Sequence, residues 1–263
     1  MDAPSSNVSG TVIDMTAVSA GSLRDPNIPV FENVHWRVAA DDYWVVAGPH
    51  GSGKSDFLMM VAGLMPPSQG SYRLFGQAMP IFDEAHLSTR LRLGLVFDGG
   101  RLFNQLTLAE NIALPLRYHR NLTPDEAKQA VERMLELTEL APWADSTPGT
   151  VGRNWQKRAG LARALILRPA VLLLDNPLAG LDPRHAGWWL NVLDQLSAGQ
   201  TLLADQPMTL VVTADDLRSW RGRARQFAVL NGRQFLTLGS QAELERTTEP
   251  LVREMLVSSS PGG

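Results

Sequence analysis

The chain has 263 residues, enough for one large domain with a substantial buried core. Hydrophobic residues make up 44% of it and charged residues 19%, which is ordinary globular usage and excludes a disordered or fibrous protein. The net charge of -3 gives no basic footprint for nucleic acid, and the absence of cysteine excludes a disulfide framework and thiolate chemistry.

The sequence carries no sign of an export signal or a membrane span. The first ten residues lack the basic end and apolar run of a signal peptide, and no window approaches the roughly 20 apolar residues of a membrane span. We therefore expect a cytoplasmic protein, for which any work at a membrane requires another chain that spans it.

The first elements expected are an antiparallel hairpin and then a strand, a loop and a helix. Residues 11–20 and 31–38 are rich in strand-forming residues and flank a turn segment with prolines and an asparagine. The apolar run at 43–48 ends in glycine, and residues 56–64 have the apolar spacing of a helix. A short loop would connect that strand to that helix.

Residues 77–165 are expected to form a helical insertion. Its clearest helix follows Thr123, a favourable N-cap, with Pro124 in the first turn and acidic residues after it. Strand signals return at 170–175 and 209–213, and the helical pattern between them indicates parallel strands of an α/β core.

The last patterned part of the chain combines an arginine-rich run with a hairpin. The run RSWRGRARQ, at 218–226, carries four arginines, and a solvated helix end accounts for it more simply than contact with lipid headgroups or RNA. Strands at 226–231 and 233–238 are predicted to form a hairpin through Asn231 and Gly232. The predicted fold class is α/β, with a mainly parallel sheet, an antiparallel β-subdomain and a helical subdomain.

The loop between the strand at 43–48 and the helix at 56–64 fits the phosphate-binding pattern G-x-x-x-x-G-K-[ST]. Glycines let the backbone turn its N–H groups toward an anion, the helix N-terminus adds positive potential, and the lysine reaches the terminal phosphates. The hydroxyl of Ser55 is expected to hold Mg²⁺. The predicted nucleotide-binding residues are Gly48, Pro49, His50, Gly51, Ser52, Gly53, Lys54, Ser55 and Asp56.

A second ligand for Mg²⁺ is predicted at Asp175. This aspartate closes the apolar run 171–174, which is how a Walker B carboxylate is delivered to a metal at the end of a buried strand. Many strands end in a polar turn residue, so the signal is weak alone. Together with the phosphate-binding loop it indicates a Mg-ATP site.

The order of these motifs resembles the nucleotide-binding subunits of ABC transporters over residues 11–245. LVFDGGRLFNQLTLAENIALPL, at 95–116, is similar to the segment after that family's Q-loop, and KRAGLARALILRPAVLLLDNPLAGLDP, at 157–183, to the run from its signature helix to its D-loop. The resemblance implies one nucleotide-binding domain with an ATP-binding core and β-subdomain at 11–76 and 166–245, a helical subdomain at 77–165 and a C-terminal tail at 246–263.

Within that family, VFDGGRLFNQLT and the late segment PLVREML, at 250–256, look most like the ATPases of lipid-transporting Mla or Mce-linked systems. In the family, two subunits sandwich ATP between the Walker motifs of one and the signature loop of the other, and the helical insertion docks a permease. The resemblance implies a homodimer or a heterodimer with another ABC ATPase. It also implies a permease partner, no nucleic acid, and a peripheral place on the inner face of the cell membrane.

Three positions that the resemblance ties to hydrolysis hold other residues. Asn176 stands where the family has a glutamate after the Walker B aspartate, and an amide cannot accept a proton at neutral pH. Ala214 replaces the switch histidine, so the γ-phosphate would lose a hydrogen-bond partner. Asp98 replaces the Q-loop glutamine, and it can still ligate Mg²⁺ through water while adding negative charge near the phosphates.

The signature and the phosphate-binding loop depart from the family as well. The motif L-S-G-G-Q aligns with residues 151–155, where Arg153, Asn154 and Trp155 replace the two glycines and the glutamine. These side chains would block the backbone amides from a partner's nucleotide, although Arg153 offers a positive charge instead. Asp56 replaces a hydroxyl residue and sets a carboxylate near the α-phosphate.

Neither the tryptophan pair at 188–189 nor the histidines indicate a binding site. Both tryptophans lie in a predicted helix, where burial against the core is the plain account. The histidines lack ligand spacing, so we expect no zinc site.

The sequence therefore predicts an ATP-binding subunit of an ABC transport complex, with lipid as the expected cargo, that binds Mg-ATP and hydrolyses it poorly. Joint loss of the base, the switch histidine, the Q-loop glutamine and the signature is the pattern of a pseudo-ATPase. Two alternatives stay open. One is a working ATPase in which Asp98 or Asp182 replaces the base, and the other is a regulatory or scaffold subunit that no longer binds nucleotide.

Overall fold

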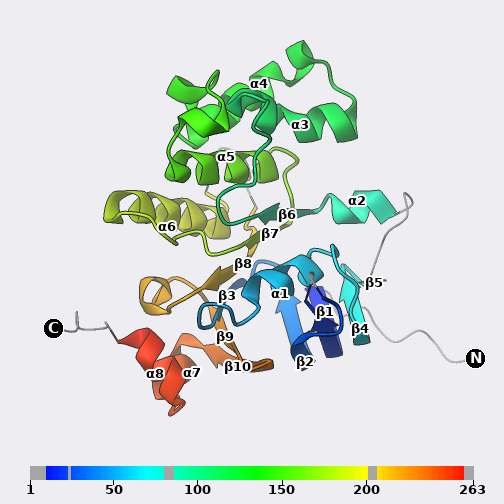
Figure 1. The fold of residues 1–263 in the computed structure, drawn as a ribbon, viewed down its shortest axis with the longest axis vertical. Helices are drawn as coiled ribbons and strands as arrows, with labels where there is room; N and C mark the ends of the chain where they lie inside the picture. The colour runs from blue at the N-terminus through cyan, green and yellow to red at the C-terminus, as the bar shows by residue number, and fades with distance from the viewer. Residues whose placement is uncertain (1–9, 23–24, 80–85, 201–205, 258–263) are drawn as a thin grey trace, which may run out of the picture.

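The computed structural model describes residues 10–22, 25–79, 86–200 and 206–257, whose strands form two sheets (Figure 1). The smaller sheet contains β2 (Pro29–Ala39), β1 (Thr11–Gly21), β4 (Gln69–Leu74) and β5 (Gln77–Ala78), in that order. The larger sheet contains β10 (Gln234–Ser240), β9 (Gln226–Asn231), β3 (Tyr43–Ala47), β8 (Thr209–Ala214), β7 (Val171–Leu174) and β6 (Leu93–Val96), in that order.

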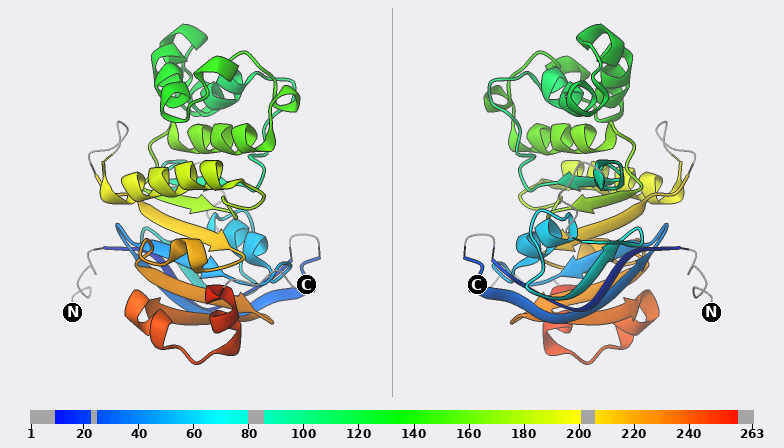
Figure 2. Two further views of the ribbon diagram at one scale, coloured as in Figure 1. Left: turned by 90° about the vertical axis from the view of Figure 1, so that its left-hand side faces the viewer. Right: turned by 90° about the vertical axis from the view of Figure 1, so that its right-hand side faces the viewer.

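Helices cover the larger sheet and extend beyond it at both ends of the molecule (Figures 1 and 2). The α-helices are α1 (Lys54–Val61), α2 (Leu87–Arg90), α3 (Leu108–Arg120), α4 (Pro124–Leu137), α5 (Arg153–Leu165), α6 (Pro183–Ala198), α7 (Gln241–Arg246) and α8 (Pro250–Leu256). Short 3₁₀-helices are η2 (Ala141–Trp143), η3 (Pro148–Thr150) and η4 (Arg218–Trp220). Helices α3 and α4 lie at the end farthest from α7 and α8.

The larger sheet is parallel from β9 to β6, and only its edge strand β10 runs antiparallel. Its central strands are continuous apolar runs, such as VLLL in β7, because a parallel sheet in an α/β fold is covered on both faces. Side chains alternate between the faces: Val45 joins the core cluster with α3 to α6, whereas Val46 joins the cluster with α1 and the smaller sheet.

The parallel register brings the carboxyl ends of four strands to one edge of the larger sheet. The phosphate-binding loop follows β3, Asp98 follows β6, Asp175 follows β7, and Ala214 ends β8. Ligands of open α/β sheets bind in the crevice outside these strand ends. The fold therefore assembles the sequence-predicted site residues in one place.

The two predicted hairpins and the parallel pairing of β7 with β8 are confirmed. The range 77–165 differs from its prediction at the start, because it contains β5 and because β6 pairs with β7 in the larger sheet. Gly94 interrupts the LGLV run of β6, which therefore lacks the uniform aliphatic pattern of the VLLL run in β7. Trp189 is fully buried, as expected for a core residue.

The predicted division into a core, a helical subdomain and a tail stays a prediction. The range of the predicted tail contains α8, which packs Val252 and Met255 into the core, and its residues 258–263 lie outside the described part. No helix in the described ranges is both long enough and apolar enough to cross a bilayer.

Candidate functional site

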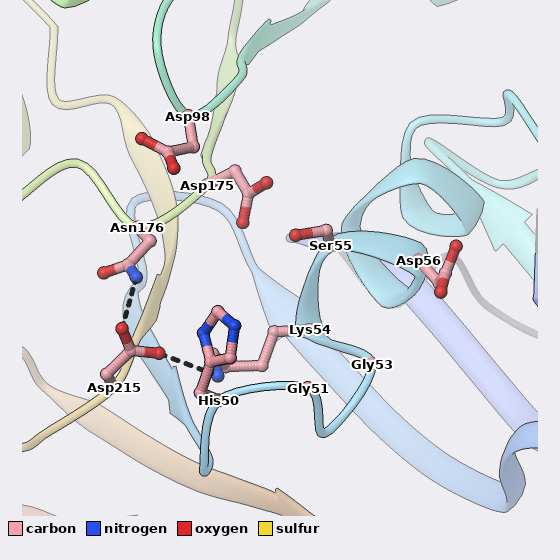
Figure 3. Close-up of a pocket in the computed structure, with 10 residues that line it drawn as sticks. All are labelled: His50, Gly51, Gly53, Lys54, Ser55, Asp56, Asp98, Asp175, Asn176 and Asp215. Atoms are coloured by element: carbon pink, nitrogen blue, oxygen red, sulfur yellow. Dashed lines mark hydrogen bonds and ion pairs between the residues drawn. The ribbon is translucent and has the colours of Figure 1, made fainter. Parts of the chain in front are cut away.

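A cavity of about 280 Å³ lies at the carboxyl edge of the larger sheet (Figure 3). Its walls come from the phosphate-binding loop and from the residues that follow β6, β7 and β8. The lining residues are His50, Gly51, Gly53, Lys54, Ser55, Asp56, Asp98, Asp175, Asn176 and Asp215.

The backbone of the loop at 48–55 depends on glycine at two positions. Gly53 has a φ of 93°, in the left-handed region, and a Cβ there would overlap the side chain of Val30. A Cβ on Gly48 would overlap the carbonyl oxygen of Leu230. The loop then turns directly into α1, whose first residue is Lys54. The fold gives the loop the tight turn into a helix that the phosphate-binding pattern predicts, and anion binding by its backbone stays a prediction.

Lys54 is buried, and its ammonium group is held inside the loop. Nζ donates to the carbonyl oxygens of Gly48, at 2.7 Å, and Pro49, at 2.8 Å. It also forms an ion pair with Oδ1 of Asp215, at 3.0 Å. A carboxylate of the same chain is therefore paired with the ammonium group that would bind a phosphate.

Asp215 is also the partner of Asn176. The Asn176 side-chain amide donates to Oδ2 of Asp215 at 2.6 Å. Partial burial raises the pKa of Asp215, but hydrogen bonds from Lys54 and Asn176 and the Lys54 charge outweigh it, so the pKa lies below its usual value. The residue that replaces the expected base is therefore a donor that supports an ionised carboxylate.

Thr213 connects the ends of β7 and β8. Its hydroxyl donates to Oδ1 of Asp175 at 3.0 Å and accepts the backbone N–H of Asn176 at 3.0 Å. Asp175 is 8% exposed, and the side chain of Ser55 points toward it across the cavity (Figure 3). The two predicted ligands of Mg²⁺ thus face each other, whereas Asp56 lies on the side of Ser55 away from Asp175.

Ala214 is buried at the end of β8, where it pairs in register with Ala47. Its carbonyl oxygen accepts the N–H of Gly48 at 3.1 Å, which fixes the start of the phosphate-binding loop. A methyl side chain offers no hydrogen bond to a nucleotide. At this position the backbone supports the loop and the side chain adds no polar group.

Asp98 is bound to two cations of α5. Its Oδ1 lies 3.0 Å from Nζ of Lys157, and its Oδ2 lies 3.4 Å from Arg153. Lys157 is 2% exposed and also donates to the carbonyl oxygens of Asn176, Pro177 and Ala179, at 3.1, 3.3 and 2.8 Å. Lys157 thus connects Asp98, which follows β6, to the turn after β7. Asp98, the predicted third metal ligand, is already paired with a cation of its own chain.

The residues that replace the signature motif pack onto α6. Asn154 contacts the His185 ring at 2.8 Å, and the Trp155 ring lies edge-on to that ring at 5.4 Å. Arg158 lies over Trp188 at 3.7 Å and forms an ion pair with Glu139 at 2.7 Å. Asn154 and Trp155 are therefore half-buried against α6, whereas Arg153 is exposed.

The charge of the cavity decides which ligands fit it. Four carboxylates and one lysine line it, although Asp98 is matched by Lys157 and Asp215 by Lys54. The Ser52 hydroxyl is buried in the loop beside Gly48 and has no partner among the described residues. Within the described part of the chain no three His, Cys, Asp or Glu side chains form a metal cluster. The arrangement fits a nucleotide that brings Mg²⁺ with it.

Sequence reasoning missed Asp215, Thr213 and Lys157. The first two follow or end β8, so the rule that polar residues gather at carboxyl strand ends was a usable signal for them. Lys157 had no such signal, because its acceptors come from a turn about 20 residues away.

A parallel sheet with a glycine-rich phosphate loop after one strand and a carboxylate after another defines the class of P-loop α/β proteins. The chain belongs to the ABC transporter family, whose model matches residues 31–179. The fold comparison agrees. A dimeric structure of the ATP-binding cassette MJ0796, in a post-hydrolysis state bound to ADP and Pi, is similar with a TM-score of 0.75, 24% identity and coverage of 84% of this chain and 95% of that one. The predicted α/β fold class is confirmed.

Two curated relatives bear on the system to which the chain belongs. It is 30% identical over 228 residues to the probable ribonucleotide transport ATP-binding protein mkl of Mycobacterium leprae, covering 86% of this chain but 64% of that protein, less than two thirds of its length. It is 27% identical over 252 residues to the intermembrane phospholipid transport system ATP-binding protein MlaF of Escherichia coli K12, covering 95% of this chain and 90% of that protein.

Proposed function

We propose that this chain is the ATP-binding subunit of an ABC transport complex that moves a lipid, and that it binds Mg-ATP while hydrolysing it very slowly. The observation that supports slow hydrolysis most directly is the hydrogen bond from Asn176 to Asp215. At the position of the expected base, the side chain is an amide that donates to a carboxylate already paired with Lys54.

The binding half rests on the loop and the two facing oxygen ligands. The backbone of residues 48–55 and Lys54 would hold the phosphates, and Ser55 with Asp175 would hold Mg²⁺. Mg²⁺ would offset the negative charge of phosphates beside several carboxylates. For Lys54 to reach a phosphate, it must share or leave Asp215, so the ion pair weakens binding without blocking it.

The hydrolytic half rests on the side chains around the expected γ-phosphate. General-base assistance contributes about 10²–10⁴-fold to a reaction, and Asn176 cannot supply it. Ala214 adds no polar side chain, and Asp98 is engaged by Lys157. Slow turnover follows from these three positions together.

Two relatives support the proposed cargo and the proposed dimer. MlaF is named for intermembrane phospholipid transport, and the MJ0796 cassette is described as a dimer, which supports a lipid cargo and a dimer for this chain. We place it on the cytoplasmic face of the cell membrane, bound to a permease and to a second ABC ATPase subunit, identical or different, without nucleic acid.

The test measures Mg-ATP binding and turnover separately. Saturating Mg-ATP should raise the unfolding free energy, by about 2.7 kcal/mol at 100 times its dissociation constant, and Lys54→Ala should remove the effect. Turnover should be near background in the unaltered chain and rise on Asn176→Glu with Ala214→His. The matched control is Asn191→Glu, on the exposed side of α6.

Two results would contradict the proposal, each in a different way. Rapid turnover by the unaltered chain, lost on Lys54→Ala, would make it a working ATPase with non-standard groups. Absence of any stabilisation by Mg-ATP would make it a scaffold subunit that does not bind nucleotide. This is the second candidate function, and the ion pair favours it because Asp215 already holds the ammonium group of Lys54.

A further inference from the structure

A second hollow lies at the opposite end of the larger sheet from the phosphate-binding loop. Tyr43 is the first residue of β3, whereas the loop follows its last residue, so roughly 13 Å separates the two ends at about 3.3 Å per residue. The hollow has a volume of about 480 Å³. Its polar lining residues are Tyr43, Asp194, Ser197, Arg221, Arg223 and Arg225.

Three segments distant in sequence form this hollow. The N–H of Arg225 donates to the carbonyl oxygen of Tyr43 at 2.9 Å, which places the arginine-rich run beside the start of β3. Trp220 is 2% exposed and packs edge-on against Tyr43, with the ring centres 6.5 Å apart. The last turns of α6 supply Asp194. The sequence predicted a solvated helix end here: η4 ends at the buried Trp220, and the arginines that follow it are exposed.

The lining carries more positive than negative charge. Arg221, Arg223 and Arg225 alternate along the run, and the single carboxylate of the lining, Asp194, forms an ion pair with Arg223. Arg225 donates one N–H to the carbonyl oxygen of Asp41 at 2.7 Å. Each guanidinium has five N–H donors, so these contacts leave donors for a ligand. Arg221 has a distant partner in Glu245, at 3.8 Å.

The Tyr43 hydroxyl is a buried donor without an acceptor among the described residues. The residue is 1% exposed, and leaving a buried O–H unpaired costs free energy. Burial raises the pKa of Tyr43 and the Asp194 charge raises it further, so the hydroxyl keeps its proton at neutral pH. Tyr43 lines the hollow together with Asp194 and Arg223.

We infer that this hollow binds a phosphate group, either of a free phosphate anion or of a phospholipid headgroup. Arg221 and Arg225 would donate N–H bonds to the phosphate oxygens, Arg223 would offset Asp194, and the Tyr43 hydroxyl would gain its acceptor. Charge-assisted bonds from guanidinium groups are the usual means of holding phosphate in proteins. This site is separate from the proposed nucleotide site and does not depend on hydrolysis.

The test titrates the full chain with inorganic phosphate by calorimetry, with Lys54→Ala in every variant to weaken phosphate binding at the nucleotide site. Tyr43→Phe removes only the unpartnered hydroxyl and should weaken phosphate binding about tenfold without lowering the melting temperature. Arg225→Gln should weaken it by a similar factor. The matched controls are Tyr118→Phe, on the surface of α3, and Arg133→Gln, on the surface of α4.

A parallel titration with vesicles distinguishes the two sources of phosphate. Phosphatidylglycerol vesicles are compared with phosphatidylcholine vesicles by co-sedimentation. Binding of inorganic phosphate that depends on Tyr43 and Arg225 supports a site for a free anion. Binding of phosphatidylglycerol vesicles with the same dependence, and weak binding of inorganic phosphate, supports a headgroup site.

Two outcomes overturn the inference. One is that neither inorganic phosphate nor phosphatidylglycerol vesicles bind in the Lys54→Ala background. The other is that they bind equally well to Tyr43→Phe, Arg225→Gln and the controls. In either case Tyr43 is an ordinary core tyrosine, and the arginines serve only their contacts with Asp194 and Asp41.

Discussion

Two buried lysines, Lys54 in the phosphate-binding loop and Lys157 in α5, differ in what surrounds their ammonium groups. Lys54 is 7% exposed, contacts two carbonyl oxygens and Asp215, and lines the cavity. Lys157 is 2% exposed and contacts three carbonyl oxygens and Asp98, and it is not among the residues that line the cavity. One charge borders space for a ligand, and the other is enclosed by its own chain.

This difference indicates that Lys54 serves ligand binding and that Lys157 serves structural support. A buried charge is tolerated only when it is paired and hydrogen-bonded. Lys54 can exchange Asp215 for a phosphate because both side chains border the cavity and Asp215 is 45% exposed. Lys157 cannot change partners without leaving the carbonyl oxygens of the turn after β7 without their donor, although Asp98 would keep Arg153. Its function is therefore to fix that turn, which carries Asn176.

The largest expected effect is on stability, from Lys157→Met. Asp98 is 40% exposed and keeps Arg153, so the cost comes mainly from the carbonyl oxygens of Asn176, Pro177 and Ala179, which lose their donor, and is about 1–3 kcal/mol. The melting temperature should fall by roughly 2–12 °C. Thermal unfolding of Lys157→Met, Lys54→Met and the exposed control Lys128→Met measures this.

Lys54→Met should lose less stability than Lys157→Met, because Lys54 holds two carbonyl oxygens at the cavity, where water can replace it, whereas Lys157 holds three away from the cavity. Lys128→Met should stay within about 0.5 kcal/mol of the unaltered chain. If Lys157→Met melts with the Lys128→Met control, the supporting function assigned to Lys157 is wrong.

A smaller effect is expected on nucleotide affinity, from Asp215→Asn. The substitution removes the carboxylate that competes for Lys54, while an amide can still accept the hydrogen bond from Asn176. A partly exposed ion pair is worth up to about 1 kcal/mol, so the affinity for Mg-ATP should rise by up to about fivefold. Calorimetric titration with Mg-ATP measures the change.

The neighbouring Asp216 provides the matched control for that titration. Its carboxylate is held by Arg218, at 2.8 Å, and it does not line the nucleotide cavity. Asp216→Asn should leave the affinity unchanged. Equal affinities for Asp215→Asn and the unaltered chain would mean that the ion pair does not oppose nucleotide binding.

The part of the site that follows strands could be predicted from the sequence. The phosphate-binding loop and Asp175 each follow an apolar strand and line the cavity, because parallel strands end at one edge, whereas Asp98 was expected only from the resemblance to the ABC transporter family. The strands β7 and β8 were found because uninterrupted aliphatic runs mark buried parallel strands. The strand β6 was missed because Gly94 interrupts its LGLV run, whereas the equally short VLLL run of β7 is aliphatic throughout.

The pairings within the site could not be predicted, because they depend on register and on helix packing. Lys54 meets Asp215 only because β3 and β8 run side by side with Ala47 opposite Ala214. Lys157 meets Asp98 only because α5 packs beside β6, which was assigned to the helical region. A sequence motif predicts which residue stands at a position, but it does not predict which side chain of the chain pairs with that residue.

The smallest expected effect is the pH dependence of the contribution of Asp215. Its folded-state pKa is lowered, so its ion pair stabilises the fold above the unfolded pKa of about 3.9, and this contribution is lost as the pH falls through the folded-state value. The difference in unfolding free energy between the unaltered chain and Asp215→Asn should be present at neutral pH and shrink in acid. Carboxyl NMR titration should give a higher pKa for Asp215 in Lys54→Met, and an unchanged pKa there would show that Lys54 does not hold this carboxylate in its ionised form.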